Sequence, residues 1–194
     1  MPTPAPTGPC FAGDTLVEVQ GKGIVKMESL QVGDRVLTSK DDLDPYELVY
    51  AFGHKDPNKA AEFISLVTNN KKTKPAPLQV TGEHMVFLFQ DGNEKKKKPK
   101  AVPASTIQVG NVLWGQDGTA DMVTKIRTVK GTGIYSPLTP SGRIVVNGIV
   151  ASTYTSLQSY ADQEDGYFAS IYSNQDLIHL VNAPFRLLCM GIST

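Results

Sequence analysis

Short apolar stretches separated by turn residues run through most of this 194-residue chain. The stretches are rich in β-branched and aromatic residues, and Gly, Pro, Asn or Asp gather between them, which is typical of strands. No long segment has a 3.6-residue apolar period, so the pattern predicts an all-β domain. The predicted strands are 15–19, 35–38, 47–52, 63–67, 85–89, 122–126 and 143–146. Helix is expected only in a mixed tail, from about 156 to 188.

An internal echo indicates that the β pattern is built twice. The segment Leu30-Gln31-Val32-Gly33 recurs as Ile107-Gln108-Val109-Gly110, and each copy is soon followed by Val-Leu. Two diverged copies of one β-unit, packed about a pseudo-twofold axis, would give this pattern. Chance similarity between short β-rich segments is the alternative.

Composition narrows the function classes. Nineteen basic residues balance nineteen acidic ones, so no general attraction to nucleic acid or an anionic membrane is expected. The run Lys95–Lys98 is interpreted as a solvated hairpin loop. Two cysteines cannot form a disulfide framework, and no Cys/His spacing resembles a metal site. No cofactor is expected. The protein is expected to be a monomer.

The sequence does not determine the cellular compartment of the protein. No apolar run approaches the roughly 20 residues that a membrane helix needs, so no membrane span is predicted. The first residues lack the basic start and apolar stretch of a signal peptide. Either the protein is intracellular, or the sequence is a piece of a longer precursor.

Cys10 stands where a proline-rich lead-in meets the β pattern. Residues 1–9 hold four prolines and predict an extended, unpacked segment. The Pro9–Cys10 amide therefore joins a flexible segment to a rigid one. A thiol at Cys10 can attack the Pro9 carbonyl and convert the peptide bond into a thioester, provided that the thiol is activated and the leaving amine protonated. A buried packing role for this cysteine is the alternative.

Thr81-Gly82-Glu83-His84 could supply the assistance at the start of an apolar strand. The Thr81 hydroxyl can bond the scissile amide, and the His84 imidazole can donate a proton to the leaving nitrogen. As a bare pattern T-x-x-H is weak. The alternative is a strand-entry turn with a surface histidine.

The motifs together resemble the Hint domains of hedgehog proteins and inteins. The resemblance is carried by 10–15 (CFAGDT), 33–37 (GDRVL), Thr81-x-x-His84, 136–147 (SPLTPSGRIVVN), 151–154 (ASTY) and 183–188 (APFRLL). The last three are specifically similar to hedgehog autoprocessing domains. The resemblance implies an all-β horseshoe of two pseudo-symmetric halves, with Cys10 as nucleophile and Thr81 and His84 promoting an N-to-S acyl shift. The implied division is an upstream segment 1–9, a Hint domain 10–155 and an extension 156–194 similar to the start of the hedgehog sterol-recognition region.

Departures from the hedgehog pattern concern the second step. Pro9 stands where hedgehog proteins carry glycine, and His54 stands where they carry the aspartate thought to deprotonate a sterol. His54 is either a substitute base or a polar strand-end residue. Thr153 replaces a cysteine, which leaves Cys189 as the other thiol, and Cys189 is interpreted as packing. Because the sequence also stops soon after Leu188, resolution by a sterol is not expected.

These features predict a self-cleaving, cysteine-dependent autoprotease that acts once on its own upstream segment. Cleavage at Pro9–Cys10 would pass through a thioester, resolved by water or a small nucleophile. Splicing is disfavoured, because the end of the sequence lacks the His-Asn pair of an intein. The alternative is a catalytically degenerate Hint domain that serves as a binding or spacer module.

Overall fold

The computed structural model describes residues 8–40, 42–70, 76–89 and 99–155, and in this part of the chain it contains strands and short 3₁₀ turns but no α-helix. The strands are β1 (Phe11–Ala12), β2 (Leu16–Val19), β3 (Gly23–Lys26), β4 (Arg35–Leu37), β5 (Tyr46–Leu48), β6 (Ala51–Thr68), β7 (Leu78–Val80), β8 (His84–Phe89), β9 (Lys100–Pro103), β10 (Val112–Trp114), β11 (Ala120–Leu138), β12 (Arg143–Val146) and β13 (Ile149–Thr155). The 3₁₀ turns are η1 (Met27–Ser29) and η2 (Ala104–Thr106). The all-β prediction is confirmed.

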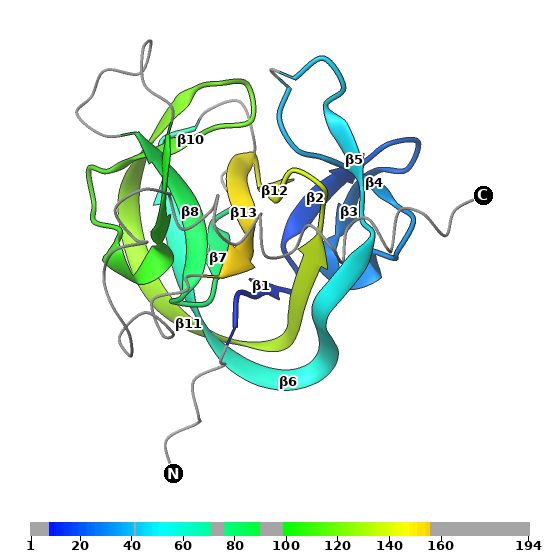
Figure 1. Cartoon of the computed structure of the whole chain (residues 1–194). Helices are drawn as coiled ribbons and strands as arrows, with labels where there is room; N and C mark the ends of the chain where they lie inside the picture. Colours follow the sequence, from blue (N-terminus) through cyan, green and yellow to red (C-terminus); the bar gives the residue numbers. More distant parts are fainter. Residues whose placement is uncertain (1–7, 41, 71–75, 90–98, 156–194) are drawn as a thin grey trace, which may run out of the picture.

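The strands form one strongly bent antiparallel sheet whose two ends make separate groups. The order is β1-β7-β6-β11-β10-β8-β13-β12-β2-β4-β5, with β3 beside β2 and β9 beside β8. In Figure 1, the long ribbons β6 and β11 curve together beneath the molecule and join the group around β8 to the group around β2 and β4. The short strand β1 lies between the two groups and pairs with both β7 and β11.

The length of β6 and β11 corrects the sequence prediction. The predicted strand 47–52 is wrong as a single strand, because the chain changes partners at its centre. Val49 N–H donates to the Asp34 carbonyl, and Tyr50 N–H donates to the Leu138 carbonyl. Segments 63–67 and 122–126 are strands, but they are short parts of β6 and β11. Pro and Gly residues within these ribbons indicate turns in the sequence. In the sheet, several of them lie at register shifts, where the pairing of β6 with β11 continues past them.

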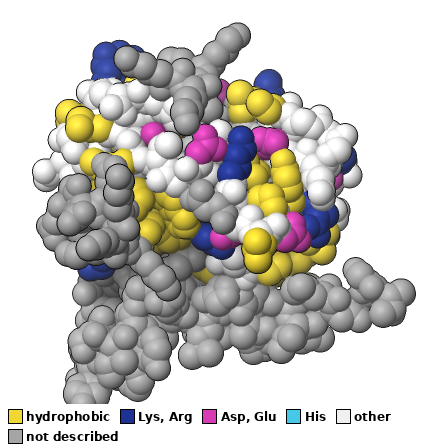
Figure 2. Space-filling model, turned by 90° about the horizontal axis from the view of Figure 1, so that it is seen from above, with side chains coloured by type: hydrophobic (Ala, Val, Ile, Leu, Met, Phe, Trp, Pro, Cys, Tyr) yellow, Lys and Arg dark blue, Asp and Glu magenta, His cyan; other side chains and the backbone are white. Residues whose placement is uncertain are grey.

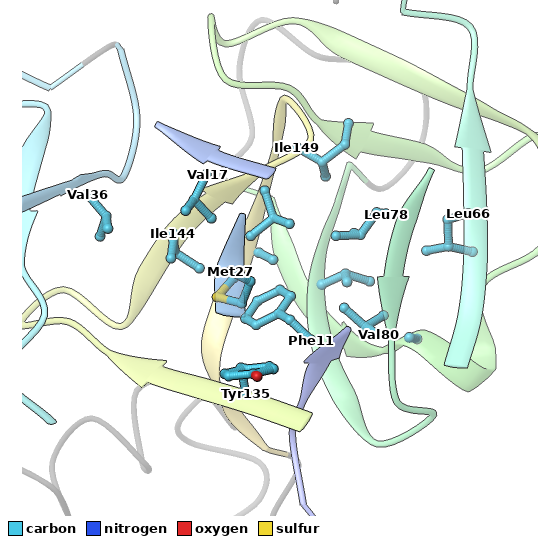
Figure 3. Packing of buried hydrophobic residues seen from close by; sticks show 14 of the residues in the cluster. Phe11, Val17, Met27, Val36, Leu66, Leu78, Val80, Tyr135, Ile144 and Ile149 are labelled. Atoms are coloured by element: carbon cyan, nitrogen blue, oxygen red, sulfur yellow. The ribbon is translucent and has the colours of Figure 1, made fainter. Parts of the chain in front are cut away.

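The core lies where the two groups meet, and β1 sends a side chain into it. Phe11 is fully buried, and Figure 3 shows its ring near Met27, Tyr135 and Val80, which come from different elements. Burying an aromatic side chain of this size stabilises a fold by about 2–3 kcal/mol. Phe11 therefore anchors the strand that begins one residue after Cys10.

The internal echo marks two structurally equivalent turns. Gly33 and Gly110 have φ angles of 97° and 94°, in the left-handed region that favours glycine. Each glycine N–H donates to a backbone carbonyl farther along the chain, that of Val49 for Gly33 and that of Val123 for Gly110. Both turns follow a 3₁₀ turn, η1 or η2, and precede a short strand, β4 or β10. The two segments therefore have the same local structure, as expected for two copies of one β-unit.

The exposed surface in the view from above mixes side chains of different kinds. Figure 2 shows hydrophobic patches with basic and acidic side chains interspersed between them. The part of the chain that the structure describes contains no helix long and apolar enough to cross a membrane. The predicted Lys95–Lys98 loop, the helical tail within 156–188 and Cys189 lie outside the described residues.

Candidate functional site

Cys10 is buried immediately before β1, and its backbone is held by Thr81. The Cys10 amide N–H donates to Thr81 Oγ1 at 3.1 Å, and the Thr81 amide N–H donates to the Cys10 carbonyl at 3.0 Å. The Thr81 hydroxyl in turn donates to the Gly8 carbonyl at 2.9 Å. Thr81 thus holds the chain on both sides of Pro9, and the Pro9–Cys10 bond lies between these anchors.

The T-x-x-H motif is a tight turn between two strands. Thr81 directly follows β7, and His84 is the first residue of β8. The His84 amide N–H donates to the Thr81 carbonyl at 3.1 Å and closes the turn. The prediction that His84 opens an apolar strand is confirmed, while Thr81 lies just after the preceding strand. Because β7 pairs with β1, the turn is brought beside Cys10.

His84 is fully buried, so the alternative of a surface histidine is wrong. Its ring lies edge-on to Phe11, with the centroids 4.2 Å apart. Its Nε2 atom lies 2.8 Å from the Ser152 carbonyl oxygen. Two extra residues in β13, between Ala151 opposite Val86 and Thr155 opposite His84, make the bulge that contains Ser152. Bulges near active sites commonly re-aim groups in this way.

The contact with Ser152 determines the tautomer of the neutral His84 ring. A carbonyl oxygen only accepts hydrogen bonds, so Nε2 carries the proton and Nδ1 of the neutral ring carries a lone pair. Nδ1 is buried and has no hydrogen-bond partner among the described residues. Burial lowers the pKa of His84 to about 4, although the hydrogen bond to Ser152 opposes this shift. His84 is therefore neutral at neutral pH.

The Cys10 thiol is protonated at rest. Burial raises its pKa to about 11, and the positive charge of Lys59 opposes the rise. The Sγ atom lies 3.8 Å from Nδ1 of His54, within reach of a weak sulfur hydrogen bond. Since the thiolate rather than the thiol is the nucleophile, this cysteine needs a base to act. His54 is the titratable side chain in hydrogen-bond contact with the sulfur among the described residues.

The structure thus brings Cys10 into direct contact with both Thr81 and His54. His54 lies near the start of β6, on its exposed stretch, and contacts the Cys10 sulfur. His84 makes no hydrogen bond with Cys10 and reaches this region through the Thr81 turn and the Phe11 ring. Thr153, at the hedgehog cysteine position, is buried in the β13 bulge, and its hydroxyl has no hydrogen-bond partner among the described residues.

Comparison with known proteins shows which family this chain belongs to. The profile of the Hint module matches residues 2–187, which is nearly the whole chain. The chain belongs to the Hint family. Curated relatives of this Hint domain include Warthog protein 4 of Caenorhabditis elegans, 30% identical over 166 residues, and Sonic hedgehog protein of Danio rerio, 27% identical over 191 residues. The matches cover 79% and 94% of this chain but only 29% and 41% of those proteins.

Solved structures show the same fold at low sequence identity. The crystal structure of the gp41-1 intein matches this Hint domain with a TM-score of 0.57 at 16% identity, over 75% of this chain and 99% of that one. The bacterial intein-like domain from Clostridium thermocellum matches with a TM-score of 0.55 at 16% identity, over 74% of this chain and 97% of that one. The predicted Hint fold is confirmed.

Other possible sites lie away from Cys10. Within the described ranges, no group of three or more His, Cys, Asp or Glu side chains could hold a metal ion. A pocket of about 390 Å³ opens beside β2 and the β12–β13 turn. Its lining includes Leu16, Ile24 and Asn147 and none of the four predicted site residues.

Sequence reasoning missed two residues that shape this site. Gly8 accepts the Thr81 hydrogen bond and packs against the His54 ring. The Gly8-Pro9 pair was visible in the sequence as a turn-prone dipeptide, but nothing there indicated a contact with residue 54. Ser152 acts through its backbone carbonyl, which no sequence pattern reports.

Proposed function

We propose that this Hint domain cleaves its own chain at Pro9–Cys10 through an N-to-S acyl shift and a thioester. The observation that supports the proposal is the anchoring of the Gly8 carbonyl and the Cys10 amide N–H by the Thr81 hydroxyl. A single side chain thus holds the nitrogen of the scissile bond and the carbonyl of the preceding Gly8–Pro9 peptide group. Because the reacting groups are already held in place, less conformational entropy is lost on the way to the transition state, and the barrier is lower.

The first step is removal of the thiol proton. Nδ1 of His54 accepts the proton from Cys10 Sγ, and the sulfur attacks the Pro9 carbonyl carbon. A C–S bond forms, and the carbonyl π electrons move to the oxygen. Because the pKa of the thiol is raised to about 11, ionisation without this base would be rare at neutral pH.

The second step is departure of the Cys10 nitrogen. The carbonyl re-forms, the C–N bond breaks with its electron pair on nitrogen, and His84 donates a proton to that nitrogen from Nδ1. His84 takes this proton from solvent beforehand, and His54 later returns the thiol proton to solvent, so the protons balance. With a pKa of about 4, roughly one His84 ring in a thousand is protonated at pH 7, but that form is a strong acid.

The thioester is then resolved by water or a small nucleophile. Water adds to the thioester carbonyl, the C–S bond breaks, and Cys10 recovers its thiol proton. The products are an upstream segment ending in a free Pro9 carboxyl group and a domain beginning at Cys10. This reaction is a single turnover on the domain's own chain.

A fusion with a reporter protein before Met1 tests the proposal. Dithiothreitol or hydroxylamine should speed release of a product ending at Pro9, because both attack thioesters. The variant Cys10→Ala should stay intact in every condition, and Cys189→Ser serves as the matched thiol control and should cleave normally. His84→Ala should slow release by about 10²–10⁴-fold, the usual contribution of one acid–base group.

A degenerate Hint domain is the competing function, and the buried, protonated thiol is the observation that favours it. The same fusion separates the two. An intact parent fusion after prolonged incubation with hydroxylamine would reject cleavage and favour a binding or spacer role. Thiol-induced cleavage that survives in Cys10→Ala, or that occurs at another bond, would reject Cys10 as the nucleophile.

A further inference from the structure

Gly8, two residues before the nucleophile, adopts a backbone conformation that suits glycine. Its φ angle is +147°, a region that side-chain-bearing L-residues rarely enter. Gly8 also precedes a proline, and residues in that position are normally confined to φ near −120°. Any other residue here would therefore strain the backbone or abandon the observed path.

The space beside Gly8 is occupied by the ring of His54. A Cβ atom added to Gly8 would lie 2.7 Å from Cε1 and 3.2 Å from Nδ1 of that ring. The first distance is shorter than ordinary van der Waals contact, so the imidazole would have to move. Nδ1 is the atom that lies 3.8 Å from Cys10 Sγ. A side chain at position 8 would thus displace the ring that contacts the nucleophile.

The backbone of Gly8 has little freedom to move away instead. Its carbonyl accepts the Thr81 hydroxyl at 2.9 Å, and the Cys10 N–H donates to the same hydroxyl at 3.1 Å. Pro9 between them has a fixed φ angle. The chain from Gly8 to Cys10 is therefore held at both ends, while the His54 ring covers one side of Gly8.

We propose that Gly8 is a specificity-determining residue, and that this Hint domain processes only acyl segments with glycine two residues before the nucleophile. A Cβ atom at this position would displace the His54 ring from its contact with the Cys10 sulfur. The inference rests on the proposed self-cleavage, and it adds the class of acyl donor that the site accepts: chains that end in glycine followed by one further residue.

Cleavage of the reporter fusion by dithiothreitol is the first test. Gly8→Ala should slow release by about 100-fold, the scale of a misplaced reacting group. Gly21→Ala and Gly110→Ala are matched controls, because both glycines have positive φ angles and no atom lies within 4 Å of an added Cβ. Both controls should stay within about threefold of the parent. Release from Gly8→Ala at the control rate would overturn the proposal.

Hydrogen exchange in the non-cleaving Cys10→Ala background is the second test, and it needs no catalysis. In that background the residue-10 amide still faces the Thr81 hydroxyl, so slow exchange reports the seated segment. Adding Gly8→Ala should speed this exchange by about 10-fold or more, while the Val49 amide, bonded to the Asp34 carbonyl, stays unchanged. Adding His54→Ala as well should restore part of the protection, because the ring is then absent.

The two tests separate this proposal from the proposed function. If the parent fusion never cleaves, self-cleavage fails, and the exchange measurement alone decides whether Gly8 seats the segment. If the parent cleaves but residue-10 exchange is the same with and without the Gly8→Ala substitution, the glycine requirement fails and self-cleavage stands.

Discussion

The Nε2 atom of His84 lies 2.8 Å from the carbonyl oxygen of Ser152, inside a bulge of β13. This contact fixes the ring tautomer and leaves Nδ1 unprotonated in the neutral state. It also ties the T-x-x-H turn to a strand near the end of the described chain. Protonation of His84 therefore concerns both the stability of the domain and its chemistry.

His84 should make the domain less stable in mild acid. Its pKa is lowered by burial from 6.5 to about 4, so the unfolded chain binds a proton that the folded chain does not. Stability from this group is full above pH 6.5 and is lost as pH falls toward 4, by about 3 kcal/mol in all. Urea unfolding of the Cys10→Ala protein at pH 7 and pH 4 measures the loss.

His84→Gln in the same background is the control for that measurement. Glutamine does not titrate, so the pH-dependent loss should shrink by most of this amount, although the variant is less stable at pH 7. An identical pH dependence in both proteins would show that His84 titrates normally and that its burial is not maintained in solution.

Cys10 should resist alkylation far above the pH at which an ordinary thiol reacts. Burial raises its pKa to about 11 from 9.0, and the thiolate is the reactive form. In a Cys189→Ser protein, the rate of reaction with iodoacetamide should still be rising steeply at pH 10, whereas the rate for the urea-unfolded protein should be half-maximal near pH 9 and level off near pH 10. A native profile that is half-maximal near pH 9 or below would contradict this assignment.

Some parts of the fold could be predicted from sequence, because they depend on local chemistry. The turns at Gly33 and Gly110 need glycine, so their echo survives in the residues themselves. Most short strands have the β-branched pattern that strands require. The ribbons β6 and β11 could not be predicted at full length, since Pro57 and Gly133 indicate turns unless the partner strand is known.

Some features of the candidate site could likewise be predicted from the sequence, and others could not. Thr81 and His84 were suggested by their spacing, and the strand pairing of β7 with β1 brings that turn beside Cys10. The burial of His84 could not be predicted, because it depends on Phe11 and on a bulge some 70 residues later in the chain. The contact of His54 with Cys10 spans 44 residues and depends on the curvature of β6.

The hydrogen bond of the Thr81 hydroxyl should affect the rate of cleavage more than the volume of the Thr81 side chain does. Thr81→Val keeps the side-chain volume but leaves the buried Cys10 N–H without an acceptor, which costs about 1–3 kcal/mol. Thioester formation should slow by about 5- to 150-fold. Thr81→Ser retains the hydroxyl and should stay within about fivefold of the parent. Equal rates for the valine and serine variants, measured as dithiothreitol-induced release, would contradict a role for the hydrogen bond.

Water or added thiol, rather than a sterol, should resolve the thioester. A base for a sterol hydroxyl would have to face an apolar pocket, and in this structure His54 contacts the Cys10 sulfur instead. The described pocket beside β2 includes neither His54 nor Cys10 in its lining. We therefore expect the released segment to end in a free carboxyl group at Pro9, and cholesterol to leave the rate of release unchanged.

Intact-mass spectrometry of the released segment, with and without cholesterol in detergent, measures this outcome. The free acid should be the product in both conditions, and dithiothreitol should add its own mass. A segment heavier by one sterol would contradict the expectation and would make His54 a base for the second step as well. His54→Asp is the informative variant, because it restores the hedgehog residue while removing the imidazole from Cys10. It should slow thioester formation, and sterol capture by this variant alone would show that His54 is what prevents sterol use in the parent.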